Sequence, residues 1–404
     1  MMASAVAAQA GASVLLLERN SSLGRKLLIT GKGRCNLTNM CSVQEVLDNI
    51  PTGSRFLHSA LNAFSPNDTF RLFERLGVPL KTERGGRVFP QSDSSADVVQ
   101  ALRRYMDETG VKQKHARVQK LIAQDGSITA ISSASGDIIC GAAILATGGI
   151  SYPSTGSNGD GHAMARDLGH NVTPLRASLV PLEAERGICA RMQGLTLKNV
   201  RMLVYSGSAK PVFDDFGEVL FTHFGLSGPL ALSASAHMRD AGGGLGATGY
   251  YAIVDLKPAL DDKMLDLRIL RDFDKYINRC FVNSLTDLLP KAMIPIIVEK
   301  SGIPPLIKVN SISRKQRMGL IDAIKRFRIG IDGKRPVEEA IVTSGGVDLR
   351  EINPKTMESK LVGGLFFAGE IIDADAYTGG FNLQIAWSTA YAAGRAASQR
   401  AKRR

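Results

Sequence analysis

Glycines and cations alternate in residues 23–36, which read Leu-Gly-Arg-Lys-Leu-Leu-Ile-Thr-Gly-Lys-Gly-Arg-Cys-Asn. The side chains that could bind an anion here are those of Arg25, Lys26 and Arg34, and the glycines beside them are Gly31 and Gly33. Cations can neutralise a pyrophosphate, and glycines let backbone N–H groups approach it because they carry no Cβ. The stretch therefore predicts a site for the phosphates of a nucleotide.

An acidic residue closes the apolar segment before this stretch. Residues 2–10 predict a small-residue helix that ends at Gly11, and residues 13–17 predict a buried parallel strand that ends in Glu18. Helix, glycine turn, strand and terminal acid form the second half of a Rossmann βαβ unit, in which the acid accepts a hydrogen bond from a ribose hydroxyl. Glu18 alone is equally compatible with the end of an ordinary surface strand. The first strand and Gly-rich turn of such a unit are not in the sequence.

A second glycine-rich motif lies near the C-terminus. Residues 361–370 predict an apolar strand, and residues 383–398 predict an Ala-rich helix. The polar residues and glycines between or at the ends of these elements are Gly369, Glu370, Asp373, Gly379 and Gly380. A helix entered through Thr-Gly-Gly directs free N–H groups and its positive dipole end forwards. That arrangement would stabilise the negative charge that a flavin gains on reduction.

A third glycine pair follows an apolar strand in the first half of the chain. Residues 116–123, 128–133 and 137–145 predict a meander, and its last strand runs into Ala146, Thr147 and Gly148. A strand that ends in glycines lets the backbone pass close to a dinucleotide. Such a turn also occurs without a ligand, so it gains weight only beside the other motifs.

Together these motifs resemble the BaiN-like (YhiN-like) bacterial flavoproteins, also called the aminoacetone-oxidase family. The resemblance rests on Leu-Leu-Glu-Arg-Asn, Leu-Gly-Arg-Lys, Gly-Lys-Gly-Arg-Cys-Asn-Leu-Thr-Asn and Phe-Ala-Gly-Glu…Thr-Gly-Gly-Phe-Asn-Leu-Gln, and it spans nearly the whole chain. It implies FAD on a glutathione-reductase-like fold and an FAD-dependent oxidoreductase. The family pattern begins earlier, with the strand and Gly-rich loop, so a truncated flavoprotein with little activity is one expectation.

The resemblance also implies which residues meet the cofactor. Val118 would meet the adenine, Glu370 and Asp373 the ribityl and pyrophosphate region, and residues 380–383 the isoalloxazine ring. The expected cofactor-binding residues are Glu18, Arg25, Lys26, Gly31, Gly33, Arg34, Asn36, Val118, Ala146, Thr147, Gly148, Gly369, Glu370, Asp373, Gly379, Gly380, Phe381, Asn382 and Leu383.

The middle of the chain predicts an insertion into the cofactor domain. Residues 195–222 alternate apolar and polar side chains, as in an antiparallel barrel, and residues 260–330 switch to helical spacing. We therefore expect an α/β fold: a Rossmann-like, glutathione-reductase-type FAD-binding domain with an inserted β-barrel plus helical cap domain. The expected ranges are 1–177 and 340–404 for the FAD-binding domain, 178–258 and 331–339 for the barrel, and 259–330 for the cap.

Length and composition favour a globular enzyme of two or three domains. The 404 residues are 44% apolar and 22% charged, which excludes wholesale disorder, and the net charge of +12 suits phosphate-rich ligands. The five cysteines form no CxxC pair, so we expect a reducing cytoplasm, no disulfide framework and no metal. No apolar run reaches the ~18 residues of a membrane span, so no membrane partner is expected.

The expected reaction is hydride transfer through flavin N5 to or from a small organic substrate, with NAD(P)H as a candidate reductant and O₂ as an alternative oxidant. No nucleophile–base–acid set is recognisable, so the catalytic residues and the substrate are not indicated. His162 is a candidate acid or base, and Asp160 is expected to cap the helix that follows it. A tRNA-modifying flavoenzyme is one alternative, because residues 260–330 carry a surplus of basic side chains. A solvated basic face explains that surplus as well, so nucleic acid is the less favoured partner. An enzyme for steroid-like acids is a further alternative, and the oligomeric state is not indicated.

Overall fold

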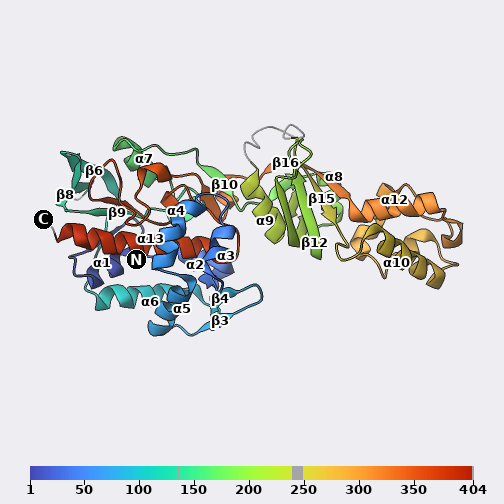
Figure 1. Ribbon diagram of the computed structural model, residues 1–404, viewed down its shortest axis with the longest axis horizontal. Helices are drawn as coiled ribbons and strands as arrows, with labels where there is room; N and C mark the ends of the chain where they lie inside the picture. Colours follow the sequence, from blue (N-terminus) through green and yellow to red (C-terminus); the bar gives the residue numbers. More distant parts are fainter. Residues whose placement is uncertain (135, 239–248, 403–404) are drawn as a thin grey trace. The chain divides into compact units, whose positions relative to one another are not determined.

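Figure 1 shows the computed structural model, which describes residues 1–134, 136–238 and 249–402. The contacts divide the chain into two compact units. Unit 1 contains Met1–Ser178 and Val337–Arg404, and unit 2 contains Leu179–Pro336. Unit 1 is therefore built from both ends of the chain, and unit 2 is inserted between them.

The helices of unit 1 begin at recognisable signals. Ser42 and Ser65 each form a capping box with the acid three residues later, Glu45 and Asp68, which satisfies N–H groups that a helix start leaves free. The helices are α1 (Met2–Gln9), α2 (Arg25–Ile29), α3 (Val43–Asp48), α4 (Ser54–Ala63), α5 (Pro66–Arg75), α6 (Ser95–Glu108), α7 (Asp160–Asp167) and α13 (Phe381–Ala401).

The strands of unit 1 form several small sheets. They are β1 (Leu15–Glu18), β2 (Thr38–Asn39), β3 (Leu80–Thr82), β4 (Arg87–Pro90), β5 (Lys112–His115), β6 (Val118–Gln124), β7 (Ser127–Ser133), β8 (Gly136–Ile139), β9 (Ala143–Leu145), β10 (Arg176–Ser178), β17 (Val342–Ser344) and β18 (Leu365–Phe367). The sheet β2–β4–β3, the sheet β6–β7–β8 and the pair β10–β17 are antiparallel. The pairs β1–β5 and β9–β18 are parallel.

Each parallel pair has one open edge. In β1 the carbonyls of Val14 and Glu18 accept hydrogen bonds from the β5 side. Backbone groups alternate along a parallel strand, so those of Leu15 and Leu17 point away from β5, and those of Ile144 point away from β18. Within the described residues, neither β1 nor β9 pairs with a strand at this second edge.

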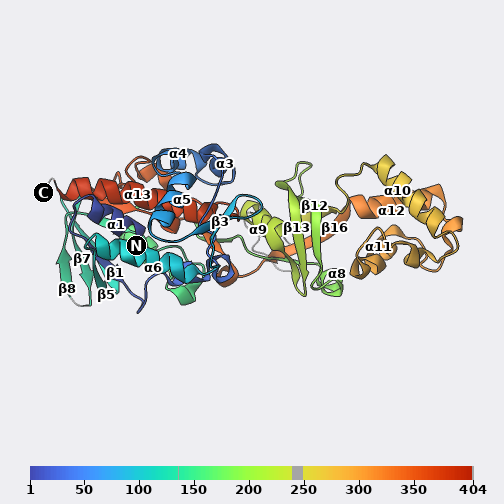
Figure 2. The same cartoon turned by 90° about the horizontal axis from the view of Figure 1, so that it is seen from below.

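Small residues bring the helices α1 and α13 close together. A Cβ at Gly394 of α13 would lie 2.6 Å from the carbonyl oxygen of Ala3 in α1, so the contact depends on a residue without a side chain. The helix α1 also packs on α6, and Figure 2 shows α1 between α13 and α6. The apolar face of α1 is buried as a result, from Met2 to Ala7.

The core of unit 2 is a closed six-stranded barrel in the order β11–β14–β13–β12–β15–β16. Its strands are β11 (Leu182–Ala184), β12 (Thr196–Tyr205), β13 (Phe213–Thr222), β14 (Gly225–Ser227), β15 (Tyr251–Asp255) and β16 (Phe327–Lys334). Buried and exposed residues alternate along β16, as expected for a barrel wall.

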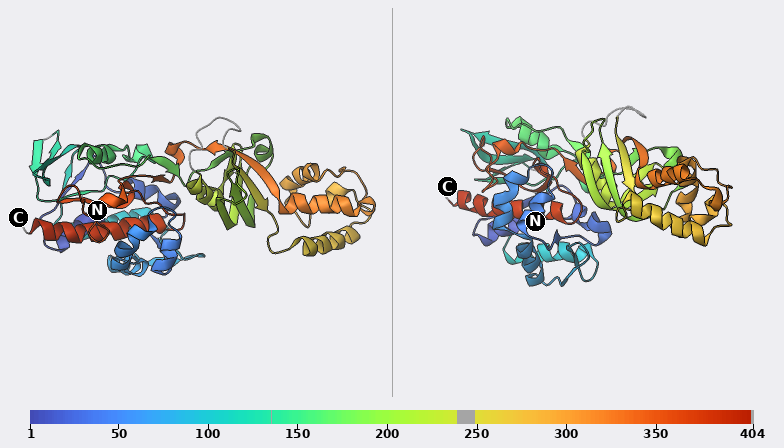
Figure 3. Two further views of the ribbon diagram at one scale, coloured as in Figure 1. Left: turned by 45° about the horizontal axis from the view of Figure 1, so that its top comes forward. Right: turned by 45° about the vertical axis from the view of Figure 1, so that its right-hand side comes forward.

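The helices of unit 2 share one apolar core with the barrel. They are α8 (Arg186–Arg191), α9 (Gly228–His237), α10 (Asp262–Lys275), α11 (Ile294–Ser301) and α12 (Arg314–Lys325). Lys325 of α12 and Asp255 of β15 form an ion pair of 2.6 Å with both side chains largely buried, which ties the helical part to the barrel. Figure 3 shows α10 (gold) and α12 (orange) packed beside each other.

The α/β fold with a barrel is confirmed, but several local predictions were wrong. The expected strand 137–145 is broken at residues 140–142 into β8 and β9, because β8 extends the β6–β7 meander while β9 turns to pair with β18. The strand β5 was missed, since Lys-Gln-Lys-His shows no apolar pattern and its four residues are exposed. The barrel strand β16 begins at Phe327, inside the range expected to be helical.

Candidate dinucleotide site

Unit 1 contains a cavity of about 810 Å³ that is lined by β1, β9, the start of α2 and the loop before α7. Its apolar part lies between the open edges of β1 and β9 and is covered by α1 and the end of α13. Its polar part contains Glu18, which ends β1, and residues 146–148, which follow β9. Ligands of open parallel α/β sheets bind at these carboxyl ends.

The polar part is organised around the Glu18 carboxylate. Its oxygen Oε1 accepts hydrogen bonds from the Asn20 backbone N at 2.8 Å and the Asn20 side-chain Nδ2 at 2.9 Å. Asn20 Nδ2 also donates to the Thr155 carbonyl, and Asn20 Oδ1 accepts from Arg25 Nη1 at 3.2 Å. One amide therefore connects the strand end, a cation of α2 and the loop before α7.

A second network joins the N-terminal and C-terminal motifs. Lys26 Nζ donates to Glu370 Oε2 at 2.5 Å and to Ser151 Oγ at 2.7 Å. The other Glu370 oxygen accepts from Ser151 Oγ and from the Thr343 backbone N. Glu370 and Lys26 thus satisfy each other, although Lys26 still lines the large cavity.

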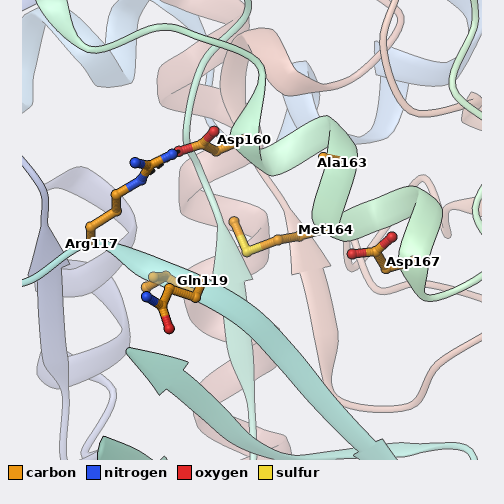
Figure 4. A pocket seen from close by; sticks show the side chains of 7 residues that line it. Arg117, Gln119, Asp160, Ala163, Met164 and Asp167 are labelled. Atoms are coloured by element: carbon orange, nitrogen blue, oxygen red, sulfur yellow. Dashed lines mark hydrogen bonds and ion pairs between the residues drawn. The ribbon is translucent and has the colours of Figure 1, made fainter. Parts of the chain in front are cut away.

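A smaller cavity of about 330 Å³ adjoins the large one, since residues of both walls are shared. It is lined by Arg117, Val118, Gln119, Asp160, Ala163, Met164 and Asp167, most of which are labelled in Figure 4. Arg117 and Asp160 point toward each other across it, with Nη2 and Oδ2 3.0 Å apart. Val118, the expected adenine contact, lies in the wall of both cavities.

The expected capping role of Asp160 was wrong. The cap position of α7 is Gly159, whose side is bare, and no side-chain cap bond forms there. Asp160 Oδ2 instead lies 3.0 Å from Arg19 Nη1 as well as 3.0 Å from Arg117 Nη2. Asp160 therefore links the residue after β1 to the residue before β6, while still facing the positive end of α7.

The structure brings only part of the expected cofactor-binding set to the cavity. The residues of that set that line it are Glu18, Arg25, Lys26, Val118, Ala146, Thr147 and Gly148. The residues that do not line it are Gly31, Gly33, Arg34, Asn36, Gly369, Glu370, Asp373, Gly379, Gly380, Phe381, Asn382 and Leu383. Binding of the cofactor by either group stays a prediction.

Arg34 has protein partners in place of a phosphate. Its guanidinium forms ion pairs with Glu83 and, at 2.7 Å, with Asp93, and it lies 4.1 Å over the ring of Phe89. These bonds raise the pKa of Arg34 and lower the pKa of Asp93. The sequence gave no sign of this arrangement, because it depends on how the β3–β4 hairpin packs.

The glycines before α13 are explained by the packing of the chain on itself. Gly380 has φ +100°, and a Cβ there would lie 2.3 Å from the Thr38 carbonyl oxygen. With the Asn36 amide oriented to match its neighbours, its oxygen accepts from Gly380 N at 3.0 Å. The Gly379 carbonyl accepts from Asn39. The requirement for glycine at position 380 is therefore already met by Thr38.

Other residues of the C-terminal motif are also engaged. The Asn382 side chain bonds the N and O atoms of Ala376 at 2.9 and 2.7 Å, and Gly369 N donates to Thr389. Burial raises the pKa of Asp373. Phe381 is 6% exposed and packs in the core of unit 1.

His162, the candidate acid or base, lines neither cavity. It is fully buried, and its Nε2 lies 3.2 Å from the Ile371 carbonyl oxygen. Its Nδ1 has no hydrogen-bond partner among the described residues. Burial lowers the pKa of His162, so the ring is held neutral near pH 7.

The polar part of the large cavity fits the ADP half of FAD. A strand-end carboxylate suits the ribose diol, and Arg25 and Lys26 suit a pyrophosphate. Gly148 (φ +75°) and Gly156 (φ +102°) keep the surrounding backbone free of side chains. In the part of the chain that the structure describes, no group of His, Cys, Asp and Glu could hold a metal ion, and no helix is long and apolar enough to cross a membrane.

The HI0933-like protein Rossmann domain matches residues 1–396. The chain belongs to the HI0933-like family. Among its relatives is the 3-dehydro-bile acid delta(4,6)-reductase of Clostridium scindens, 32% identical over 398 residues that cover 96% of this chain and 93% of that protein. The ribosomal RNA dihydrouridine synthase of Escherichia coli is 30% identical over 392 residues, which cover 97% of this chain and 94% of that protein.

A solved structure agrees with the fold of this HI0933-like protein. The 3-ketosteroid delta1-dehydrogenase of Sterolibacterium denitrificans superposes with a TM-score of 0.52, at 12% identity, covering 98% of this chain and 97% of that one. Family membership confirms the resemblance stated from the motifs, the Rossmann-type FAD-binding fold and the oxidoreductase class.

Sequence reasoning missed Asn20 and the loop 155–158, although all of them line the cavity. Asn20 follows Glu18 by two residues, and that spacing places an Asn amide within reach of a strand-end carboxylate. The loop gave a signal too, because Gly156 and Gly159 both have positive φ. The missing information was which residue the loop approaches.

Proposed function

We propose that this HI0933-like protein is an FAD-dependent reductase that adds a hydride and a proton across a carbon–carbon double bond conjugated to a carbonyl group. One observation carries the proposal: two curated relatives, each similar over nearly the whole chain, have names that describe saturation of such a bond. One is a delta(4,6)-reductase of a 3-dehydro bile acid, and the other makes dihydrouridine.

Reduced FAD would supply the hydride. The residues of this chain would bind and orient the cofactor: Glu18 by accepting the hydrogen bonds of the ribose diol, and Arg25 with Lys26 by neutralising the phosphates. Val118 would present backbone groups to the adenine at the smaller cavity. We propose NAD(P)H as the reductant, because each reduced substrate consumes one two-electron equivalent; no second G-x-G-x-x-G loop is present in the sequence.

The test is an anaerobic titration of the FAD-loaded protein. NADH or NADPH should bleach the visible flavin band, and an electron-poor enone or a uridine-containing RNA should restore it. The product should gain two hydrogens by mass spectrometry. A flavin that NAD(P)H cannot reduce, or one re-oxidised only by O₂, would contradict the proposal and favour an oxidase.

RNA is the second candidate substrate, supported by the names of the relatives in Escherichia coli and Haemophilus influenzae. The basic side chains of unit 2 give limited further support. Several are neutralised by carboxylates, as in the pairs of Arg317 with Asp266 and Lys325 with Asp255. Lys263, Arg271 and Arg314 make none of the salt bridges found among the described residues. RNA as substrate predicts retention of ribosomal RNA fragments with a steep salt dependence, whereas a steroid-like substrate does not.

A weak cofactor site is a further part of the proposal. The open edges of β1 and β9 leave the apolar part of the cavity without a strand between them. Phosphate contacts that a Gly-rich turn would add at this place are not made by the described residues. We therefore expect substoichiometric FAD after purification, measured as the ratio of flavin to protein absorbance.

A further inference from the structure

Asn20 uses each of its polar side-chain atoms within the wall of the large cavity. Nδ2 donates to Glu18 Oε1 at 2.9 Å and to the Thr155 carbonyl at 3.0 Å, and Oδ1 accepts from Arg25 Nη1 at 3.2 Å. The backbone N of Asn20 donates to the same Glu18 oxygen at 2.8 Å. Both bonds therefore fall on one carboxylate oxygen.

The second oxygen of Glu18 is left available. None of the hydrogen bonds found among the described residues involves Oε2 of Glu18. A carboxylate that is held by one oxygen keeps a defined orientation without losing the acceptor capacity of the other. Glu18 lines the cavity, so this second oxygen can serve a ligand there.

We propose that Asn20 is a positioning residue for the dinucleotide, which fixes Glu18 toward the ribose diol and Arg25 toward a phosphate at the same time. The proposal rests on the proposed function, because it takes FAD as the ligand of the cavity. Asn20 itself touches no reacting atom. Its effect is to reduce the rotamer freedom that the two ligand-binding side chains would otherwise lose on binding.

The loop before α7 is built to receive this amide. Gly156 has φ +102°, and a Cβ there would lie 2.7 Å from Asn20 Nδ2. A side chain at position 156 would therefore push the loop away from Asn20, in addition to the strain of its backbone conformation. The close approach shows that the end of β1 and residues 155–156 are matched to each other through Asn20.

A purely structural role for Asn20 is the competing explanation. It would pin the loop and change stability, but it would not depend on whether the ligand carries ribose hydroxyls. The proposed role does depend on them, because Glu18 acts through the diol. The two explanations are separated by comparing ADP with 2′,3′-dideoxy-ADP, which keeps the base and the phosphates and lacks both hydroxyls.

The experiment is calorimetric titration of the full chain with ADP and with 2′,3′-dideoxy-ADP. Asn20→Ala should weaken ADP binding about tenfold, the equivalent of one hydrogen bond to a charged group. The same variant should change dideoxy-ADP binding by clearly less, leaving only the part that acts through Arg25. Asn20→Asp keeps the shape of the side chain and places a second carboxylate beside Glu18, so it should weaken ADP binding further.

Asn62→Ala is the matched control. Asn62 lies on α4, outside the cavity, and its side chain donates to the His58 carbonyl. This variant should bind both nucleotides like the unchanged protein. Equal losses for ADP and dideoxy-ADP in Asn20→Ala, or no loss for either, would refute the positioning role alone. Failure of the unchanged protein to bind ADP would refute both this proposal and the assignment of the cavity to FAD.

Discussion

A strand placed between β1 and β9 should stabilise unit 1. The perturbation is an extension ahead of Met1 that consists of five apolar β-branched residues and a G-x-G-x-x-G turn. The helix α1 starts at Met2 and runs back along the cavity, so the turn would lead directly into it. The added strand would run parallel to both neighbours and join β5–β1 and β9–β18 into one sheet.

The magnitude follows from the groups that face the gap. Leu15, Leu17 and Ile144 each direct one N–H and one C=O toward it, so about six backbone hydrogen bonds would form, worth about 1 kcal/mol each. Burying about three apolar side chains adds about 6 kcal/mol. Ordering five residues costs about 10 kcal/mol. The difference is about 2 kcal/mol, which raises the melting temperature of a unit of this size by about 4–8 °C.

The assay is thermal unfolding of the flavin-free protein with and without the extension, followed by the flavin-to-protein ratio after incubation with FAD. A Gly/Ser extension of the same length is the control, because it adds chain without strand propensity. A third version carries Pro at the centre of the strand, which removes an N–H from the ladder. If the β-branched, Gly/Ser and Pro versions melt at the same temperature, the gap does not accept a strand and the reasoning is refuted.

Three further predictions concern single residues. Lys26→Met should cost about 1.5–3 kcal/mol in the free energy of unfolding, because it strands the partly buried Glu370 carboxylate. The double variant with Glu370→Gln should recover part of this in urea unfolding, and simple additivity would contradict the pairing. Burial lowers the pKa of His170, so the folded protein keeps the ring neutral while the unfolded chain takes up a proton near pH 6.5. Stability should therefore fall as the pH drops from 7 to 5, with a shallower slope in His170→Gln; equal slopes would exclude His170 as a cause. Gly380→Ala should destabilise by about 3 kcal/mol or more, since its Cβ would meet the Thr38 carbonyl at a positive φ. An unchanged melting temperature with reduced flavin content would instead indicate a direct role for Gly380 at the ring.

The half of the site that binds the ADP moiety was the more predictable half. Glu18 and residues 146–148 end two parallel strands, and the carboxyl ends of parallel strands meet at one edge of a sheet. Their meeting therefore followed from recognising two apolar strands. Val118 came from the resemblance alone, because nothing in its own surroundings in the sequence marks a ligand contact.

The remaining positions depended on packing that no local pattern encodes. Arg34 has the residue type and spacing of a phosphate ligand, yet the β3–β4 hairpin supplies Glu83 and Asp93, which neutralise it first. Gly380 has the sequence context of a ligand contact, but Thr38 explains its missing side chain. A glycine or a cation in a sequence shows that space or charge is needed, and only the fold shows which neighbour needs it.

The contact between α1 and α13 has a consequence for synthesis on the ribosome. Ser398 Oγ donates to the Ala10 carbonyl oxygen, so one of the first residues made is held by one of the last. The apolar face of α1 must wait through the translation of the whole inserted unit before α13 emerges to cover it. The barrel strands and α12 are complete by then, so the inserted unit can fold first. During that interval α1 is a natural binding site for a nascent-chain chaperone, and slow translation of the last segment would prolong its exposure.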